Sequence, residues 1–233
     1  SYKTDGLIQT QEQLNAVKRA DFQPNAELGD VLFVDTNGDG KLDSSDRCMI
    51  GNPIPDIIYG INMGMAWKGF DLNLQFGGTI GNQIFNAMRY YTYFPNDITN
   101  KDRALMNYWT PNNTNTDIPR LTATDVNDND RFSDMYVENG TYFRLRNAQL
   151  GYTLPASLTQ RIKLQKVRFY VSGQNLFTIS SYSGMDPEVG QSSSLSRGID
   201  YGIYPQNISF TGGINVTSVS YTHLRAHETL RHL

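Results

Sequence analysis

A short acidic segment holds the residues of this 233-residue chain that are best spaced for chemistry. A hard cation such as Ca²⁺ takes six or more oxygen ligands, and one loop can supply them from positions 1, 3, 5, 7, 9 and 12, with a glycine at the sharp turn. We expect a structural Ca²⁺ site in this segment. The alternative is a loop held by Asx turns of its own backbone. The predicted ligands are Asp35, Asn37, Asp39, the main-chain carbonyl of Lys41, Asp43 and Asp46.

A second group of candidate residues is aromatic and lies in one long polar segment. Flat aromatic faces are surfaces on which sugar rings and peptide side chains stack. Packing within the segment itself, or against the rest of the protein, is the alternative for each residue. The predicted ligand contacts lie among Tyr90, Tyr91, Tyr93, Tyr108 and Trp109.

Composition and charge exclude several classes of protein. A net charge of −3 gives no electrostatic reason to expect a nucleic-acid partner, which would need a stripe of basic residues. The single cysteine, Cys48, cannot form an internal disulfide. All three histidines follow residue 222, so the rest of the chain has no histidine base to activate a nucleophile. Asp186 and Glu188 are close only in sequence, which is not the arrangement of a glycosidase. We therefore predict that the chain is not an enzyme.

Period-two alternation of apolar residues predicts the strands. From residue 57 to 67 the odd positions are apolar and most even positions are small or polar, and from residue 70 to 76 the even positions are apolar. Gly69 allows a tight turn between these two strands. Pro155 is typical of the start of a short helical turn. Further strands are predicted over residues 141–153, around 167–172 and over 207–216.

The connections between the predicted strands alternate in length. Short connections follow residues 67 and 153, whereas residues 79–140 and 180–206 form long polar segments. Short turns on one side and long loops on the other are typical of outer-membrane β-barrels, in which the long loops are extracellular. Five strands leave two open edges, and bacterial single-chain barrels close with an even number. The pattern therefore favours part of a larger sheet, with a soluble β-sandwich as the alternative.

Blocks along the chain resemble, in order, those of the SusC/RagA family of TonB-linked outer-membrane transporters. The resemblance covers about residues 5 to 217 and includes Trp67-Lys68-Gly69-Phe70-Asp71 and Ser172-Gly173-Gln174-Asn175-Leu176-Phe177. It implies the C-terminal part of a barrel of about 22 strands with a plugged lumen. It also implies import of glycans or peptides across the outer membrane of a Gram-negative bacterium. The implied partners are a SusD-like surface lipoprotein, the lipid of that membrane, and TonB, which would be contacted through an N-terminal part that this chain lacks.

The predicted fold is all-β, with antiparallel up-and-down strands, and the chain divides into three regions. Residues 1–55 form an extracellular loop region with the acidic loop, and residues 56–217 carry the last barrel strands with long loops at 79–140 and 180–206. Residues 218–233 hold the histidines and lack strand alternation, so we expect a non-native tail. The resulting function is that of a transporter fragment. The alternative is a soluble, calcium-stabilised β-sandwich module that binds carbohydrate.

Overall fold

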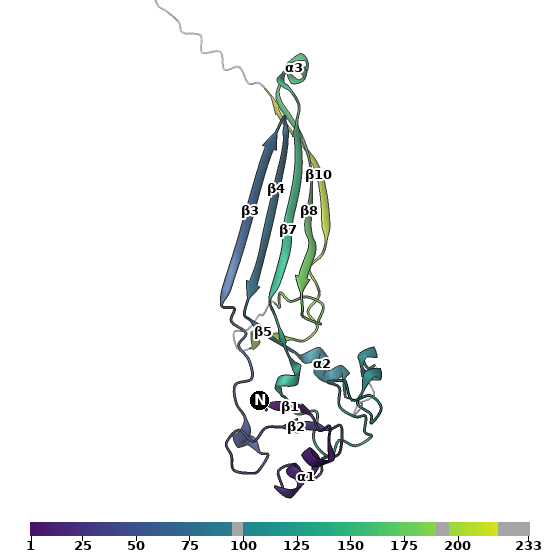
Figure 1. Ribbon diagram of the computed structural model, residues 1–233. Helices are drawn as coiled ribbons and strands as arrows, with labels where there is room; N and C mark the ends of the chain where they lie inside the picture. Colours follow the sequence, from purple (N-terminus) through teal and green to yellow (C-terminus); the bar gives the residue numbers. More distant parts are fainter. Residues whose placement is uncertain (95–99, 190–195, 219–233) are drawn as a thin grey trace, which may run out of the picture. The chain divides into compact units, whose positions relative to one another are not determined.

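The computed structural model describes residues 1–94, 100–189 and 196–218 (Figure 1). The strands are β1 (Thr4–Leu7), β2 (Val31–Phe33), β3 (Ile57–Trp67), β4 (Phe70–Ile80), β5 (Gln83–Asn86), β6 (Val137–Asn139), β7 (Tyr142–Thr153), β8 (Leu164–Ser180), β9 (Ile199–Asp200) and β10 (Ser209–Ser218). The α-helices are α1 (Gln11–Arg19), α2 (Ala87–Thr92) and α3 (Ala156–Thr159). Short 3₁₀ helices are η1 (Ser44–Asp46), η2 (Arg103–Asn107), η3 (Asp134–Tyr136) and η4 (Gln160–Ile162). Within these residues, none of the helices has the length and apolar character needed to cross a membrane.

The chain divides into two compact units. The loop unit comprises Ser1–Tyr59, Gly78–Phe143 and Ile179–Gln206. The strand unit comprises Gly60–Gly77, Arg144–Thr178 and the residues from Asn207 onward. Each unit is described by itself below.

A five-stranded sheet contains all the strands predicted from the alternation. Its order is β10-β8-β7-β4-β3, and Figure 1 shows these strands side by side. The strands β8 and β10 run antiparallel, with Ile214 opposite Phe169 and Asn215 opposite Arg168. Directly opposed residues project to the same face, so apolar side chains gather on one face and polar side chains on the other. The predicted antiparallel alternation is confirmed, and the described sheet is open rather than closed.

The apolar face of this sheet, formed by the alternating apolar residues of β3, β4, β8 and β10, is largely bare, although Val167 at the start of β8 is buried. Met65 is 60% exposed, Trp67 69%, Val171 60% and Phe210 78%. A soluble β-sandwich would bury these side chains between two sheets in a dry core. The exposed face contradicts that alternative. Apolar surface of this extent is found where a protein meets a membrane or a partner.

The connections carry more structure than the sequence predicted. Residues 79–140 contain β5, α2 and β6, and residues 1–55 contain β1, α1 and β2. The description of the chain as all-β is therefore too strong, and mostly β is correct. A capping box begins α1, because the Thr10 side chain accepts from the Gln13 amide and the Gln13 side chain accepts from the Thr10 amide. The helical turn predicted after Pro155 is confirmed as α3.

The predicted boundary of the tail is shifted by one residue. Ser218, assigned to the tail from the sequence, belongs to β10 and lies opposite Leu164. The rest of the predicted tail, residues 219–233, lies outside the described residues.

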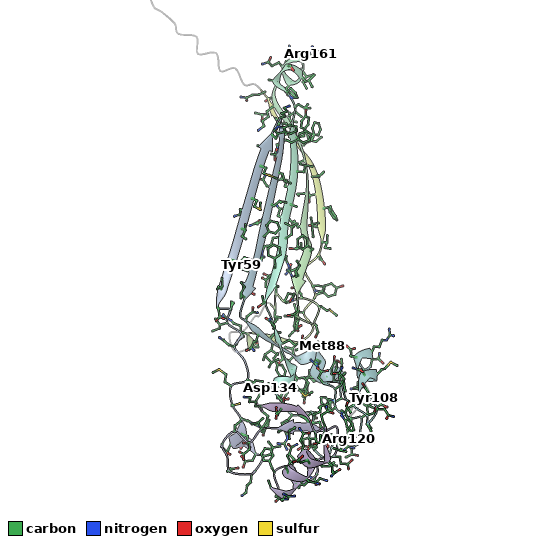
Figure 2. All side chains as sticks on the ribbon, viewed as in Figure 1. Tyr59, Met88, Tyr108, Arg120, Asp134 and Arg161 are labelled. Carbon is green, nitrogen blue, oxygen red and sulfur yellow. The ribbon has the colours of Figure 1, made fainter. Side chains whose placement is uncertain are left out.

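A buried ion pair organises the polar core of the loop unit. The Asp30 carboxylate is fully buried, and Arg120 Nε donates to its Oδ1 over 2.6 Å. Asn129 Nδ2 donates to the same oxygen, and the Glu27 amide donates to Oδ2. Figure 2 labels Arg120 and also Asp134, which accepts hydrogen bonds from the amide and hydroxyl of Thr4. A buried charge is tolerated only when it is paired and hydrogen-bonded in this way.

A second ion pair crosses the polar face of the strand unit. Arg168 of β8 donates through Nε to Asp71 Oδ1 of β4 over 2.9 Å, although β7 lies between these two strands. The residue of β7 beneath the pair is Gly151. A Cβ atom there would meet Arg168 Nη2 and would lie 2.6 Å from Asp71 Oδ1. The absence of a side chain at residue 151 is therefore what lets the ion pair span three strands.

Substitution Gly151→Val should displace this ion pair and destabilise the intact receptor by about 1–3 kcal/mol, the usual cost of overpacking. Urea unfolding in detergent measures the change. Gly64→Val is the matched control, because a Cβ at residue 64 meets its nearest neighbour, Asn73 Oδ1, at an ordinary 3.4 Å. Equal effects of the two substitutions would contradict a specific role for the crossing.

Candidate functional site

The acidic loop between β2 and β3 folds around its own main chain. Asp35 accepts hydrogen bonds from the amides of Gly38 and Gly40, over 2.6 and 2.8 Å. Asp39 Oδ1 accepts from the Lys41 amide over 2.8 Å. Both glycines have positive φ values, which favour glycine and allow the tight turns. Asn37 likewise accepts from the Asp39 amide, so the side chains that we predicted as ligands also serve as Asx-turn acceptors.

The end of the loop is closed by two further carboxylates. Asp46 is fully buried and accepts from the amides of Thr36 and Asp43, over 3.0 and 2.9 Å. Asp43 accepts from the Ser45 amide over 2.7 Å, and this hydrogen bond lowers the pKa of the Asp43 carboxyl. The described part of the chain contains no group of three or more His, Cys, Asp or Glu residues arranged to hold a metal. Calcium binding at this loop therefore stays a prediction.

Calcium should protect the acidic loop of the intact receptor from proteolysis. Binding to the folded state stabilises it by mass action, by about 2.7 kcal/mol at a hundredfold excess over the Kd. The variant Asp39→Ala should weaken calcium binding roughly tenfold or more, because it removes one charged ligand. Asp5→Ala, at an exposed aspartate outside the loop, is the control. Identical cleavage with calcium and with EGTA would show that the loop is held by its hydrogen bonds alone.

Three of the predicted aromatic residues lie in or beside α2. Tyr90 stacks on Phe132, with ring centroids 4.5 Å apart. The Arg89 guanidinium lies 4.7 Å from the ring centroid of Tyr93, and burial raises the pKa of the Tyr93 hydroxyl. These two rings are engaged within the loop unit. Tyr91 contacts Tyr90 edge-on but remains 51% exposed.

The other two predicted aromatic residues differ in exposure. Trp109 is only 6% exposed, and its indole Nε1 donates to Gln9 Oε1 over 2.8 Å. It belongs to the hydrophobic core, so little of its ring can reach a ligand. Tyr108, labelled in Figure 2, is half-buried. Ligand contacts by Tyr90, Tyr91, Tyr93 and Tyr108 stay predictions, and Tyr91 has the best-placed ring.

Tyr91 lines a cavity of about 370 Å³ within the loop unit. One wall is a face of the three-stranded sheet β6-β5-β9, in which Phe85 lies opposite Val137 on one side and Ile199 on the other. These three neighbouring side chains all line the cavity. The preceding residue of β5, Ile84, projects the other way and is buried. A continuous apolar wall therefore follows from the register of three short strands.

The polar side chains of the cavity are few. Gln83 Oε1 already accepts from the Asn52 amide over 2.9 Å. Arg197 lines the cavity and is exposed, and it has no ion-pair or hydrogen-bond partner among the described residues. Tyr201 is also a lining residue and is 60% exposed. An apolar cleft with a few convergent polar groups is the usual form of a small-molecule site.

The segment after β9 is fixed by one buried carboxylate. Asp200 accepts from the Tyr182 hydroxyl over 2.6 Å and from the amides of Gly202 and Ile203. Burial, together with this hydrogen bond, raises the pKa of the Tyr182 hydroxyl. The Asp200 side chain thus holds in place the strand end that presents Ile199 and Tyr201 to the cavity.

The sequence contained only part of the signal for this cavity. Asp200-Tyr201-Gly202 is a typical Asx turn, which could have been recognised. The pairing of β5 with β6 and β9 joins segments far apart in sequence and leaves no local pattern. Arg197 and Phe85 were therefore missed as site residues, whereas Tyr91 was included.

Comparison with known proteins identifies the class. No family model matches the chain. TonB-dependent receptor P3 of Formosa agariphila is 39% identical over 205 residues, which cover 84% of this chain and 20% of that receptor. TonB-dependent receptor SusC of Bacteroides thetaiotaomicron is 29% identical over 196 residues, which cover 84% of this chain and 18% of SusC. The chain therefore spans about a fifth of the length of the curated relatives it matches.

Solved structures give the same result. A structure of the RagAB peptide transporter superimposes with a TM-score of 0.69 and 25% identity, over 92% of this chain and 22% of the matched chain. The RagAB peptide importer in its open-open state matches with the same TM-score and 26% identity. The fold and the relatives together define part of a TonB-dependent receptor, in line with the expectation that the chain is not an enzyme. Specifically, this chain belongs to the SusC/RagA family.

Proposed function

We propose that the protein containing this chain imports glycans or peptides across the outer membrane of a Gram-negative bacterium, together with a SusD-like surface lipoprotein. The similarity to both SusC and the RagAB peptide importer supports this proposal. The observation that carries it is the bare apolar face of the five-stranded sheet, because a β-strand in a lipid bilayer turns alternate apolar side chains outward. The loop unit would then bear the long loops that meet cargo and lipoprotein.

The variant Met63→Arg should impair the folding of the intact receptor into vesicles. Met63 lies in the middle of β3 on the apolar face, and an arginine facing lipid at the midplane costs about 2–4 kcal/mol. Asn62→Arg, at the neighbouring position on the opposite face, is the matched control and should fold nearly as well as the wild type. Equal folding of both variants would contradict lipid contact by this face.

The partner and the transport activity require a separate experiment. The tagged intact receptor, purified from outer membranes, should carry a SusD-like lipoprotein with it. A strain lacking the receptor should fail to grow on the glycan or peptide that the wild type imports, and the intact gene should restore growth. A receptor that purifies alone and whose loss changes no nutrient uptake would overturn the proposal.

A further inference from the structure

We propose that the cavity beside β5, β6 and β9 binds an apolar or aromatic residue that carries a free carboxylate, as at the C-terminus of a peptide, and that Arg197 neutralises this carboxylate. The inference deepens the proposed function by naming the cargo chemistry of one site. It depends on that function only in treating the ligand as cargo, because binding itself can be measured without transport.

The walls of the cavity select an apolar group. Phe85, Val137 and Ile199 are adjacent across the three strands and present one continuous hydrophobic surface. Pro53 and Phe132 extend the apolar lining. The volume, about 370 Å³, falls in the usual range for a site that encloses a small ligand. A branched or aromatic side chain would bury its apolar surface here and gain the hydrophobic free energy of that burial.

The charge at the cavity selects an anion. Arg197 has no ion-pair partner in the part of the chain that the structure describes, and no Asp or Glu is among the described lining residues. An arginine binds a carboxylate through two parallel hydrogen bonds, a geometry that a neutral amide cannot reproduce. A cation without a counterion at the edge of an apolar cavity therefore favours a ligand with one apolar part and one carboxylate.

The hydrogen-bonding groups of the cavity lining argue against a sugar at this position. A sugar ring brings several hydroxyls, and each needs a hydrogen-bond partner when it leaves water. The oxygen of the Gln83 side chain is already used by the Asn52 amide, and the lining has no carboxylate to accept from hydroxyls. Tyr91 and Tyr201 add two aromatic rings whose hydroxyls make no hydrogen bond with a described residue. Their two hydroxyls and that of Ser1 are too few to pair all the hydroxyls of a sugar ring.

Binding of two matched probes to the intact purified receptor tests the inference. N-acetylphenylalanine carries the carboxylate, and N-acetylphenylalanine amide has the same apolar part without the charge. Titration calorimetry should show the acid binding roughly tenfold tighter than the amide, as expected for a charge-assisted hydrogen-bonded pair. Arg197→Gln should abolish this preference, and Arg197→Lys should retain part of it. Arg19→Gln, at an exposed arginine of α1, should leave the preference unchanged.

A second variant tests the contribution of the apolar cavity separately from that of the Arg197 charge. Ile50→Trp places a larger side chain at a half-buried lining residue outside any helix or strand and should weaken both probes. Equal affinity for the two probes, no binding of either, or a preference that survives Arg197→Gln would overturn the inference. Peptide uptake by a receptor without the preference would leave the proposed function intact. A receptor that shows the preference and supports no uptake would overturn the proposed function and leave the cavity assignment standing.

Discussion

Backbone hydrogen bonding along the strands is the constraint on which the rest of the structure depends. In a medium without water, every strand needs a neighbour on both edges. In the five-stranded sheet, β8, β7 and β4 have two neighbours, whereas β3 and β10 have one each. The open edges and the bare apolar face are both expected of a segment that matches only about a fifth of its relatives' length. In the barrel that we propose for the intact receptor, further strands would satisfy the edges and lipid would cover the face.

The pairing of the strands also decides where charged and polar side chains can lie. In the strand unit, Asp71 of β4 and Arg168 of β8 meet over Gly151 on one face of the sheet. In the loop unit, short strands are enough to build an apolar wall, and buried carboxylates fix the segments around it. Asp200 holds the end of β9 through the Tyr182 hydroxyl and two amides. Rigid strands that carry structured loops are the usual arrangement for a binding protein, because the strands support the loops that contact the ligand.

Local periodicity explains which features could be predicted from the sequence. The strand from Ile57 to Trp67 was predicted to the residue, because its alternation is strong and Gly69 marks the turn. The core packing of Trp109 and the cavity around Phe85 were not predictable, since both depend on segments that are remote in sequence. The acidic loop shows a different limit of prediction from the sequence. Its Asp and Asn residues fit calcium ligands and Asx-turn acceptors equally well, so the sequence pattern does not separate the two.

The central claim is that the alternation along β3 separates lipid from water in the intact receptor. A nitroxide scan of residues 61–66, one spin label at a time in lipid vesicles, tests it most directly. The account predicts that labels at Ile61, Met63 and Met65 collide mainly with oxygen, which concentrates in the bilayer, and that labels at the even positions collide mainly with a water-soluble nickel complex. A scan without this period of two, or with the opposite phase, would contradict the account.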